Sequence, residues 1–363
     1  MTNAYAQAGV DVEAGERAVA LMKASVLAAS RPEVVGDFGG FAGLFDASAL
    51  LKFKRPLLAT GTDGVGTKVV IAQRLGIHHT IGIDLVAMIA DDIVVCGAEP
   101  LFLTDYIATG KVEPTVVADI VRGVAEGCRQ AGMALLGGET AEHPGLMKAG
   151  EYDIAGAGTG VVEADELLGA DRVKVGDVII SLPSSGLHSN GYSLARYVLL
   201  GEAGQKAGLA LDKQVAEFGR TLGEEMLEPT RIYALDCLAL AKELGLNLHT
   251  FSHITGGGIA ANIARVLPSD LAADVHRDSW NALPVFDVIA FVGSVAQSSM
   301  EQTFNMGLGM VAIVDAGAAS QAVAFLNARG IAAAEIGIVR QRETSETGDA
   351  AAKGGKGGAV FVR

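Results

Sequence analysis

Residues 60–68 combine glycines with one carboxylate and one amine, the residue types that hold nucleotide phosphates. The segment reads Thr-Gly-Thr-Asp-Gly-Val-Gly-Thr-Lys, and we predict a glycine-rich turn that opens a helix. Glycines let a ligand approach the backbone, and free N–H groups at a helix start favour anions. Asp63 would repel phosphates unless Mg²⁺ lay between them, because this ion takes oxygen ligands from both. The segment therefore predicts a metal-bridged phosphate site, or else an ordinary turn in which Asp63 caps the helix.

Several better-known motifs are excluded. Gly61 and Gly66 have the spacing of a P-loop, but Thr67 and Lys68 follow in inverted order. Residues 186–191 contain one residue too many for the nucleophile elbow of hydrolases. The kinase-like tripeptides at 37–39 and 276–278 occur in the wrong order, so no protein kinase is expected.

A second acidic group contains Asp84, Asp91 and Asp92. We predict a strand at 80–83 that runs into a helix, and on that helix Asp84 and Asp91 would share one face. Their neighbours are largely apolar, and carboxylates that repel one another in such surroundings are explained by a bound divalent cation. A solvated helix face is the alternative.

Glu139 supplies a third acidic position. It lies in residues 137–142, which we predict to be a loop after an apolar strand at 133–136. Ligand loops occur at the carboxyl ends of strands in α/β sheets, so Glu139 is a candidate metal or polar ligand rather than a merely exposed turn residue. The three acidic segments are all expected to follow strands and to converge on one edge of a sheet.

Two loops in the second half have the composition of anion sites. Residues 184–191 and 253–258 are rich in Gly, Ser and Thr, and each joins an apolar strand to a helix. Such loops offer N–H groups and hydroxyls to a phosphate. His188 and His253 are either proton carriers at neutral pH or polar residues that order these loops.

The composition of the whole chain limits its class. With 28 basic and 42 acidic residues the formal charge is −14, so neither nucleic acid nor an anionic membrane is expected as a partner. The three cysteines are far apart, which predicts no disulfide framework or zinc knuckle and favours a reduced cytoplasm. No signal peptide or membrane-spanning run is recognised in the 363 residues.

Apolar strands alternate with amphipathic helices along the chain, which predicts an α/β (α+β) fold with two domains. We place the domain boundary at residues 168–169, which gives a first domain at 1–168 and a second at 169–342, and we expect a flexible Gly-rich tail at 343–363. In the first domain we also predict strands at 57–60, 101–108 and 153–162 and a helix at 115–129. In the second we predict strands at 177–182, 248–254, 310–314 and 334–339 and helices at 192–200, 230–244, 259–266 and 320–328.

Ten motifs occur in one order along the chain, at residues 9–16, 31–45, 61–68, 82–88, 97–111, 137–145, 184–194, 228–233, 253–258 and 303–310. They include GTDGVGTK, GGETAEHPG, SSGLHSNGYSL and HITGGG. Together they closely resemble the phosphoribosylformylglycinamidine cyclo-ligase family, also called the aminoimidazole ribonucleotide (AIR) synthetases. The resemblance extends from about residue 5 to residue 339.

The resemblance implies an AIR-synthetase-like fold, a homodimer whose N-terminal sheets pair, and ATP covered by the glycine-rich N-terminal segment. It assigns ATP/Mg binding and dimerisation to the N-terminal domain at 1–168, and substrate binding to the C-terminal domain at 169–342. It also implies ATP- and Mg²⁺-dependent ring closure of formylglycinamidine ribonucleotide in purine biosynthesis. In the family's mechanism ATP phosphorylates the formyl oxygen, an amidine nitrogen attacks that carbon, and phosphate leaves. Phosphorylation helps because an amide oxygen is a poor leaving group.

Site residues follow from the resemblance position by position. The implied Mg²⁺ ligands are Asp63, Asp92 and Glu139. The implied nucleotide contacts are Thr62, Asp63, Gly64, Gly66, Thr67, Lys68 and Asp84, with Lys68 as a cation near the phosphates. The implied ribonucleotide contacts are Ser189, Asn190, Thr255, Gly256 and Gly257. A catalytic role in proton transfer for His188 and His253 is our hypothesis.

One departure and two rival functions remain. Asp91 stands where the family commonly has Asn, and the extra charge would either change metal affinity or form a cap.

The first rival is another ATP-using enzyme of the superfamily, of the selenophosphate synthetase or thiamine-monophosphate kinase type. The second is a non-catalytic nucleotide-binding homologue. The first cysteine is Cys96, which argues against the N-terminal reactive residue of selenophosphate synthetase.

Overall fold

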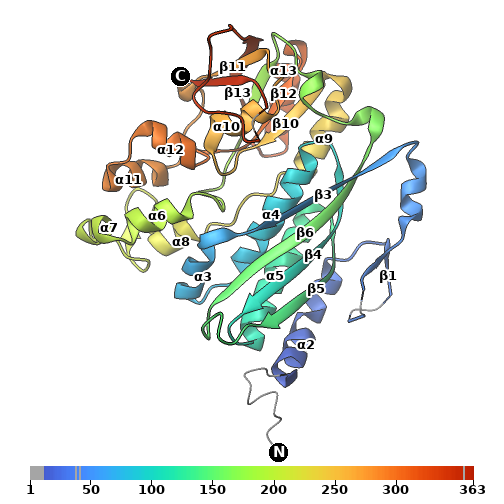
Figure 1. The fold of residues 1–363 in the computed structure, drawn as a ribbon, viewed down its shortest axis with the longest axis vertical. Helices are drawn as coiled ribbons and strands as arrows, with labels where there is room; N and C mark the ends of the chain where they lie inside the picture. The colour runs from blue at the N-terminus through green and yellow to red at the C-terminus, as the bar shows by residue number, and fades with distance from the viewer. Residues whose placement is uncertain (1–11, 37–38, 41, 355) are drawn as a thin grey trace, which may run out of the picture. The chain divides into compact units, whose positions relative to one another are not determined.

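The computed structural model describes residues 12–36, 39–40, 42–354 and 356–363 (Figure 1). Parts of the first two family motifs therefore lie outside the described residues. The chain divides into two compact units, Met1–Ile93 with Ala98–Asp165, and Val94–Gly97 with Glu166–Arg363. The division lies close to the domain boundary expected at residues 168–169.

The first unit is a four-stranded sheet with helices on one face, and the strand order is β3-β6-β4-β5 (Figure 1). Only β4 and β5 are parallel neighbours. Its elements are α2 (Val12–Ala28), β1 (Val34–Val35), β2 (Leu44–Phe45), β3 (Pro56–Gly64), α3 (Val69–Leu75), α4 (His79–Val94), β4 (Glu99–Thr109), α5 (Pro114–Ala131), β5 (Ala134–Glu142) and β6 (Tyr152–Glu163).

Alternate glycines on β6 allow α4 to lie very close to the sheet. A Cβ atom added to Gly158 would lie 2.6 Å from Cγ2 of Ile89, and one added to Gly160 would lie 2.6 Å from Cγ2 of Ile93. Because side chains alternate along a strand, these glycines form one flat stripe that receives the apolar face of α4. The stripe fixes the position of α4, which carries three of the predicted acidic residues.

The predicted strands at 101–108 and 153–162 and the helix at 115–129 are confirmed by β4, β6 and α5. Three other predictions in this unit were wrong. Residues 60–64 extend β3 instead of forming a turn, residues 80–83 belong to α4 instead of a strand, and residues 137–142 continue β5 instead of forming a loop. The small residues of β3 and β5 accept extended geometry because they pair with β6 and β4. An apolar run such as 80–83 suits a buried helix as well as a strand.

The second unit is built on a six-stranded sheet of order β10-β12-β7-β13-β11-β14. Helices α9 and α13 pack together against β10 and β7, and α10 packs against β10 and β14. The elements are β7 (Val178–Pro183), α6 (Tyr192–Leu199), α7 (Glu202–Lys206), β8 (Gln214–Val215), β9 (Arg220–Thr221), α8 (Leu222–Met226), α9 (Ala234–Leu244), β10 (Leu248–His253), α10 (Gly258–Arg265), β11 (Leu271–Val275), α11 (Pro284–Gly293), α12 (Gln297–Thr303), β12 (Leu308–Val314), α13 (Ala319–Ala328), β13 (Ala334–Gln341) and β14 (Ala359–Val362).

Every strand and helix predicted for this half is present within a few residues, and α9 begins at Ala234 rather than at residue 230. The expectation of a flexible tail at 343–363 is wrong for its last residues, which form a strand. Strand β14 pairs in parallel with β11, from Ala272↔Ala359 to Val275↔Val362. Its apolar residues are largely buried there, which explains why this part of the tail is ordered.

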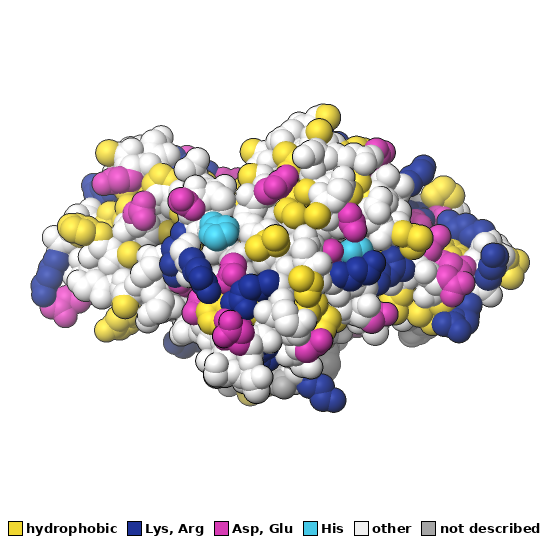
Figure 2. Space-filling view, turned by 90° about the horizontal axis from the view of Figure 1, so that it is seen from above, with side chains coloured by type: hydrophobic (Ala, Val, Ile, Leu, Met, Phe, Trp, Pro, Cys, Tyr) yellow, Lys and Arg dark blue, Asp and Glu magenta, His cyan; other side chains and the backbone are white. Residues whose placement is uncertain are grey.

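The described surface has mixed charge. Figure 2 shows acidic and basic side chains interspersed on one face, with hydrophobic side chains scattered between them. Within the described residues, none of the helices combines the length and the apolarity needed to cross a membrane. The observed architecture is thus a mixed α/β protein of two units, as the sequence predicts.

Candidate active site

Asp63 lies near the end of β3 on the helix-covered face of the sheet. It pairs with Gly156 of β6, which pairs with Asp105 of β4, so the three residues form one row across the sheet. Gly61, two residues before Asp63, lies against the backbone of Ile89 in α4. The Asp63 carboxylate is half-buried, and its Oδ1 accepts a hydrogen bond from the N–H of Gly64 at 2.7 Å. The strand thus presents Asp63 beside α4.

Lys68 and Asp84 form an ion pair that is fully buried. Their Nζ and Oδ1 atoms are 2.8 Å apart, and both side chains are 0% exposed. Gly66, with a φ of 72°, starts the short 3-10 helix Gly66–Lys68 that directs Lys68 inward. Both residues belong to the predicted nucleotide set, and both make further contacts. The ammonium is therefore held in place by the protein before any phosphate binds.

Helix α4 carries the remaining acidic residues of this region. Asp91 is buried on the same helical face as Asp84, whereas Asp92 is exposed. Because α4 packs against β3 and β6, Asp92 and Asp63 lie on adjoining elements. Two of the three predicted metal ligands thus lie on neighbouring elements of one unit.

Glu139 lies elsewhere in the same unit. It belongs to β5, is exposed, and accepts a hydrogen bond at Oε1 from the N–H of Thr140 at 2.9 Å. Strands β3 and β5 are the two edges of the four-stranded sheet. Three inter-strand steps separate these edges, a distance of about 14 Å. Asp63 and Glu139 therefore lie at a similar height on the sheet but on its two outer strands, so a single sheet does not bring the three acidic segments together.

The two loops of the second unit lie together. A Cβ atom added to Gly256 would lie 3.2 Å from Oδ1 of Asn190, so the loops at 184–191 and 253–258 are in contact. Asn262 fixes the second loop, because its Nδ2 donates to the carbonyl oxygens of Thr255 and Gly258 at 3.2 and 2.8 Å. Helix α10 starts at this point, with Gly257 at a φ of 100° as its N-cap. Free N–H groups at this helix start can receive an anion.

The two candidate histidines are buried. His188 adopts a φ of 60°, and its Nε2 accepts a hydrogen bond from the N–H of Ser185 at 3.2 Å. A nitrogen that accepts is unprotonated, so the neutral tautomer carries its proton on Nδ1. This bond orders the loop. His253 closes β10 directly before the glycine-rich segment and is 5% exposed.

One carboxyl group was missed by the sequence reading. Asp105 lies in the middle of β4, where a lone acidic residue within an apolar run was the available signal. Burial raises the pKa of this carboxyl to about 7. Gly138 leaves room for it, because an added Cβ would lie 1.9 Å from Oδ1 of Asp105.

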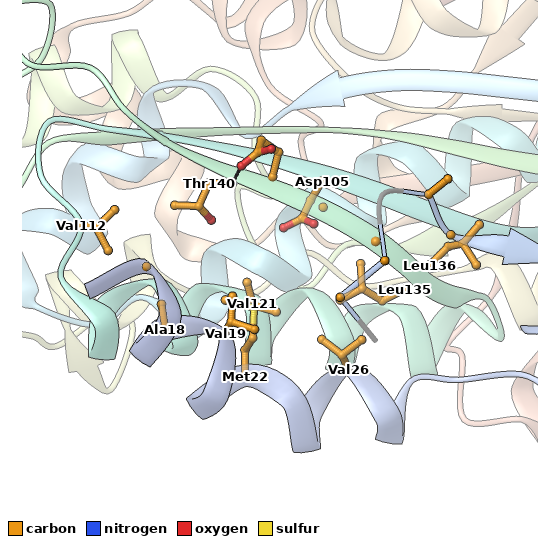
Figure 3. A pocket seen from close by; sticks show the side chains of 18 residues that line it. Ala18, Val19, Met22, Val26, Asp105, Val112, Val121, Leu135, Leu136 and Thr140 are labelled. Carbon is orange, nitrogen blue, oxygen red and sulfur yellow. Dashed lines mark hydrogen bonds between the residues drawn. The ribbon is translucent and has the colours of Figure 1, made fainter. Parts of the chain in front are cut away.

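Asp105 faces a cavity of about 390 Å³ in the first unit (Figure 3). Helix α2 supplies Ala18, Val19 and Met22 to its walls, and Glu139 and Thr140 line it from β5. The cavity combines apolar walls with a single buried carboxyl group. The described part of residues 39–43, in the glycine-rich segment, also lines it.

Comparison with known families defines the class of protein. Residues 45–162 match the N-terminal domain of AIR synthase related proteins, and residues 174–349 match their C-terminal domain. The chain belongs to the AIR synthase related family.

The chain belongs more particularly to the phosphoribosylformylglycinamidine cyclo-ligase family, because relatives of that name are similar to it over nearly the whole length. The Synechocystis sp. (strain ATCC 27184 / PCC 6803 / Kazusa) protein is 49% identical, over 92% of this chain and 96% of its own. The Myxococcus xanthus (strain DK1622) protein is 49% identical, over 96% of this chain and 99% of its own. The Geobacillus thermodenitrificans (strain NG80-2) protein is 50% identical, over 93% and 96%.

Solved structures share the fold at low sequence identity. Thiamine-monophosphate kinase from Stenotrophomonas maltophilia K279a has a TM-score of 0.65 and 17% identity, over 95% of each chain. Hydrogenase maturation protein HypE in complex with ATP has a TM-score of 0.60 and 19% identity, over 90% of this chain and 86% of its own. Such distant similarity establishes the architecture alone.

Proposed function

We propose that this protein is the ligase that closes the imidazole ring of formylglycinamidine ribonucleotide, giving 5-aminoimidazole ribonucleotide, ADP and phosphate in purine biosynthesis. The observation that carries the proposal is 48–50% identity to several cyclo-ligases over more than nine-tenths of the chain. The ordered acidic, glycine-rich and His-Ile-Thr-Gly segments of both units support it.

The arrangement of carboxylates fits a site for Mg²⁺ and the ATP phosphates. Asp63 and Asp92 offer oxygen donors on β3 and α4, and Lys68 provides a positive charge that is already oriented by Asp84. Bound Mg²⁺ would neutralise phosphate charge. Lys68 would stabilise charge on the transferred phosphoryl group, and the backbone of residues 64–67 would position the phosphates.

The reaction then needs positioning more than covalent chemistry from the protein. The formyl oxygen takes the phosphoryl group, the amidine nitrogen forms the new C–N bond, and the C–O bond breaks as phosphate leaves. We assign the ribonucleotide phosphate to the start of α10, with Ser189, Asn190, Thr255, Gly256 and Gly257 as its contacts. The contact between Asn190 and Gly256 supports this assignment. His188 and His253 remain candidates for proton transfer.

A homodimer would complete the metal site. Glu139 lies on the sheet edge opposite to Asp63, so one sheet cannot bring these two carboxylates together. If β5 of one subunit lies beside β3 of another, Glu139 of the second subunit joins Asp63 and Asp92 of the first. The exposed side chains of Leu58 and Tyr106, on the sheet face opposite to the helices, support sheet-to-sheet association. Mg²⁺ binding, the dimer and this shared site are parts of the proposal.

Cytoplasmic location is proposed as well. Cys96, Cys128 and Cys237 are all free thiols, which suits a reducing compartment.

The test is turnover by the purified protein. Formylglycinamidine ribonucleotide, ATP and Mg²⁺ are mixed, ADP release is followed, and the aromatic amine product is detected by diazo coupling. Stoichiometric ADP and amine are expected. ADP without amine would favour another enzyme of the superfamily, and ATP binding without turnover would favour a non-catalytic homologue.

The role of Asp63 gives the first prediction. Asp63→Asn should lower Mg²⁺-dependent turnover by about 100-fold or more, because it removes a charged ligand at the phosphates. The free energy of unfolding should change little, since Asn can keep the hydrogen bond from Gly64. Asp91→Asn is the comparison variant and should retain activity, because the family commonly has Asn there. Near-normal turnover of Asp63→Asn would refute the metal role.

A further inference from the structure

Three side chains that can bind metals meet at one end of the sheet in the second unit. Asp177 directly precedes β7, His249 lies near the start of β10, and Asp315 directly follows β12. Strand β12 lies between β7 and β10 and is antiparallel to both, so all three residues are at the same end. One ligand atom from each lies within 4.8 Å of the others. The two phosphate-binding loops proposed above follow the opposite ends of β7 and β10.

The pairing of the strands directs His249 into this position. The register between β10 and β12 shifts between Leu248 and Thr250, so His249 is the additional residue of a β-bulge. Bulges turn a side chain away from the regular alternation of a strand. Backbone N–H groups also orient both carboxylates, from Lys174 to Oδ2 of Asp177 at 2.7 Å and from Gly317 to Oδ1 of Asp315 at 2.9 Å.

The charge of the cluster is not balanced by other side chains. Asp177 and His249 are each 2% exposed, Asp315 is half-buried, and Nδ1 of His249 lies 2.6 Å from Oδ2 of Asp177. Among the described residues, no Lys or Arg forms an ion pair with either carboxylate. Two carboxylates and one imidazole therefore share a largely buried position with a formal charge of −2, or −1 if the imidazole is protonated. Such a charge is costly without a further cation.

We propose that Asp177, His249 and Asp315 bind one divalent transition-metal ion, with Zn²⁺ preferred over Mg²⁺. The imidazole nitrogen decides this preference, because Mg²⁺ favours oxygen ligands alone whereas Zn²⁺ accepts a mixture of nitrogen and oxygen. Three protein ligands leave one position of a tetrahedral site for water. The ion would join the ends of β7, β10 and β12, and so stabilise the sheet that carries the substrate loops.

Zinc binding to the full-length, chelator-treated protein tests this proposal. Titration calorimetry is done with ZnCl₂ in excess Mg²⁺, which occupies sites made of carboxylates alone, and thermal unfolding is recorded in parallel. The wild type should bind one equivalent of Zn²⁺ at this site and unfold at a higher temperature with it. Asp315→Asn should weaken zinc binding by about tenfold or more. Replacing a residue that only hydrogen-bonds to a metal ligand already lowers metal affinity by about that factor.

A matched control separates ligand loss from loss of a cap. Asp315 and Asp46 both cap short 3-10 helices, and Asn caps as well as Asp. Asp46→Asn should therefore leave zinc affinity unchanged. Absence of zinc binding to the folded wild type, or equal affinity in Asp315→Asn, would overturn the proposal.

Discussion

At the scale of single residues, the nucleotide site proposed for the first unit includes one fully buried ion pair, Lys68 with Asp84. Lys68 and Asp84 are 16 positions apart in sequence, and the incorrect prediction of a strand at 80–83 concealed their pairing. Asp63, Asp92 and Glu139 could be selected as acidic residues in glycine-rich or apolar surroundings. The position of Asp63 and Glu139 on opposite edge strands of one sheet could not be predicted, because sequence spacing carries no information on strand order.

The buried ion pair gives a prediction for stability. Lys68→Met or Asp84→Asn alone should lower the free energy of unfolding by about 3–5 kcal/mol, because each removes one charged partner of a buried ion pair. The double variant Lys68→Met with Asp84→Leu should regain most of that loss in urea unfolding. It should remain inactive in ATP turnover, since the cation at the phosphates is absent. Restored turnover in the double variant would mean that Lys68 has only a structural role.

Asp105 predicts a pH dependence of stability. Its carboxyl has a pKa of about 7 in the folded protein, raised by burial from an ordinary value of 3.8. Between these values the folded state binds a proton that the unfolded state has released, so stability falls as pH rises through this window. The total loss is about 4 kcal/mol.

Asp105→Asn removes this titration. Relative to wild type, the variant should therefore gain stability progressively from about pH 4 to pH 7 and keep that advantage above pH 7. Denaturant unfolding at several pH values measures the difference. Asp153→Asn, an exposed position on β6 of the same sheet, is the control and should follow the wild type. Parallel curves for Asp105→Asn and wild type would contradict the assigned pKa.

At the scale of elements, the sequence predicted best where the periodicity was clear. Helix α5, with apolar residues at helical spacing after Glu113-Pro114, was found within a few residues, and so were the strands of the second unit. Segments rich in glycine were misread, because Gly and Thr suit both turns and paired strands. Those segments include the ends of β3 and β5. Their state depends on neighbouring strands that are distant in sequence.

The glycine stripe on β6 gives a prediction at this scale. Gly158→Ala should lower the free energy of unfolding by about 1–3 kcal/mol, because the added methyl group would lie 2.6 Å from Ile89 and displace α4. Gly137→Ala on β5 is the matched control, since nothing lies within 4 Å of its added Cβ. Thermal and urea unfolding measure both. Equal effects of the two changes would show that backbone entropy, rather than helix packing, determines the cost.

At the scale of the whole molecule, the order of the two units could be predicted from sequence, but the completeness of the site could not. One chain contains Asp63 at one edge of its sheet and Glu139 at the other. If the site forms within a dimer, each site takes Asp63 from one subunit and Glu139 from its partner. Two different inactive variants can then complement each other.

We therefore expect activity from a mixture of Asp63→Asn and Glu139→Gln subunits, although each variant alone is inactive. In a mixed dimer both changes fall into one site, and the second site contains only wild-type residues. Random assembly from equal amounts makes half of the dimers mixed, so the mixture should recover about a quarter of wild-type turnover. The variants are co-expressed with different tags, and the isolated mixed dimer, in which one site of two is wild type, should show about half of wild-type turnover. If Asp63 and Glu139 acted within one subunit, each site in the mixed dimer would carry one change and no activity would return.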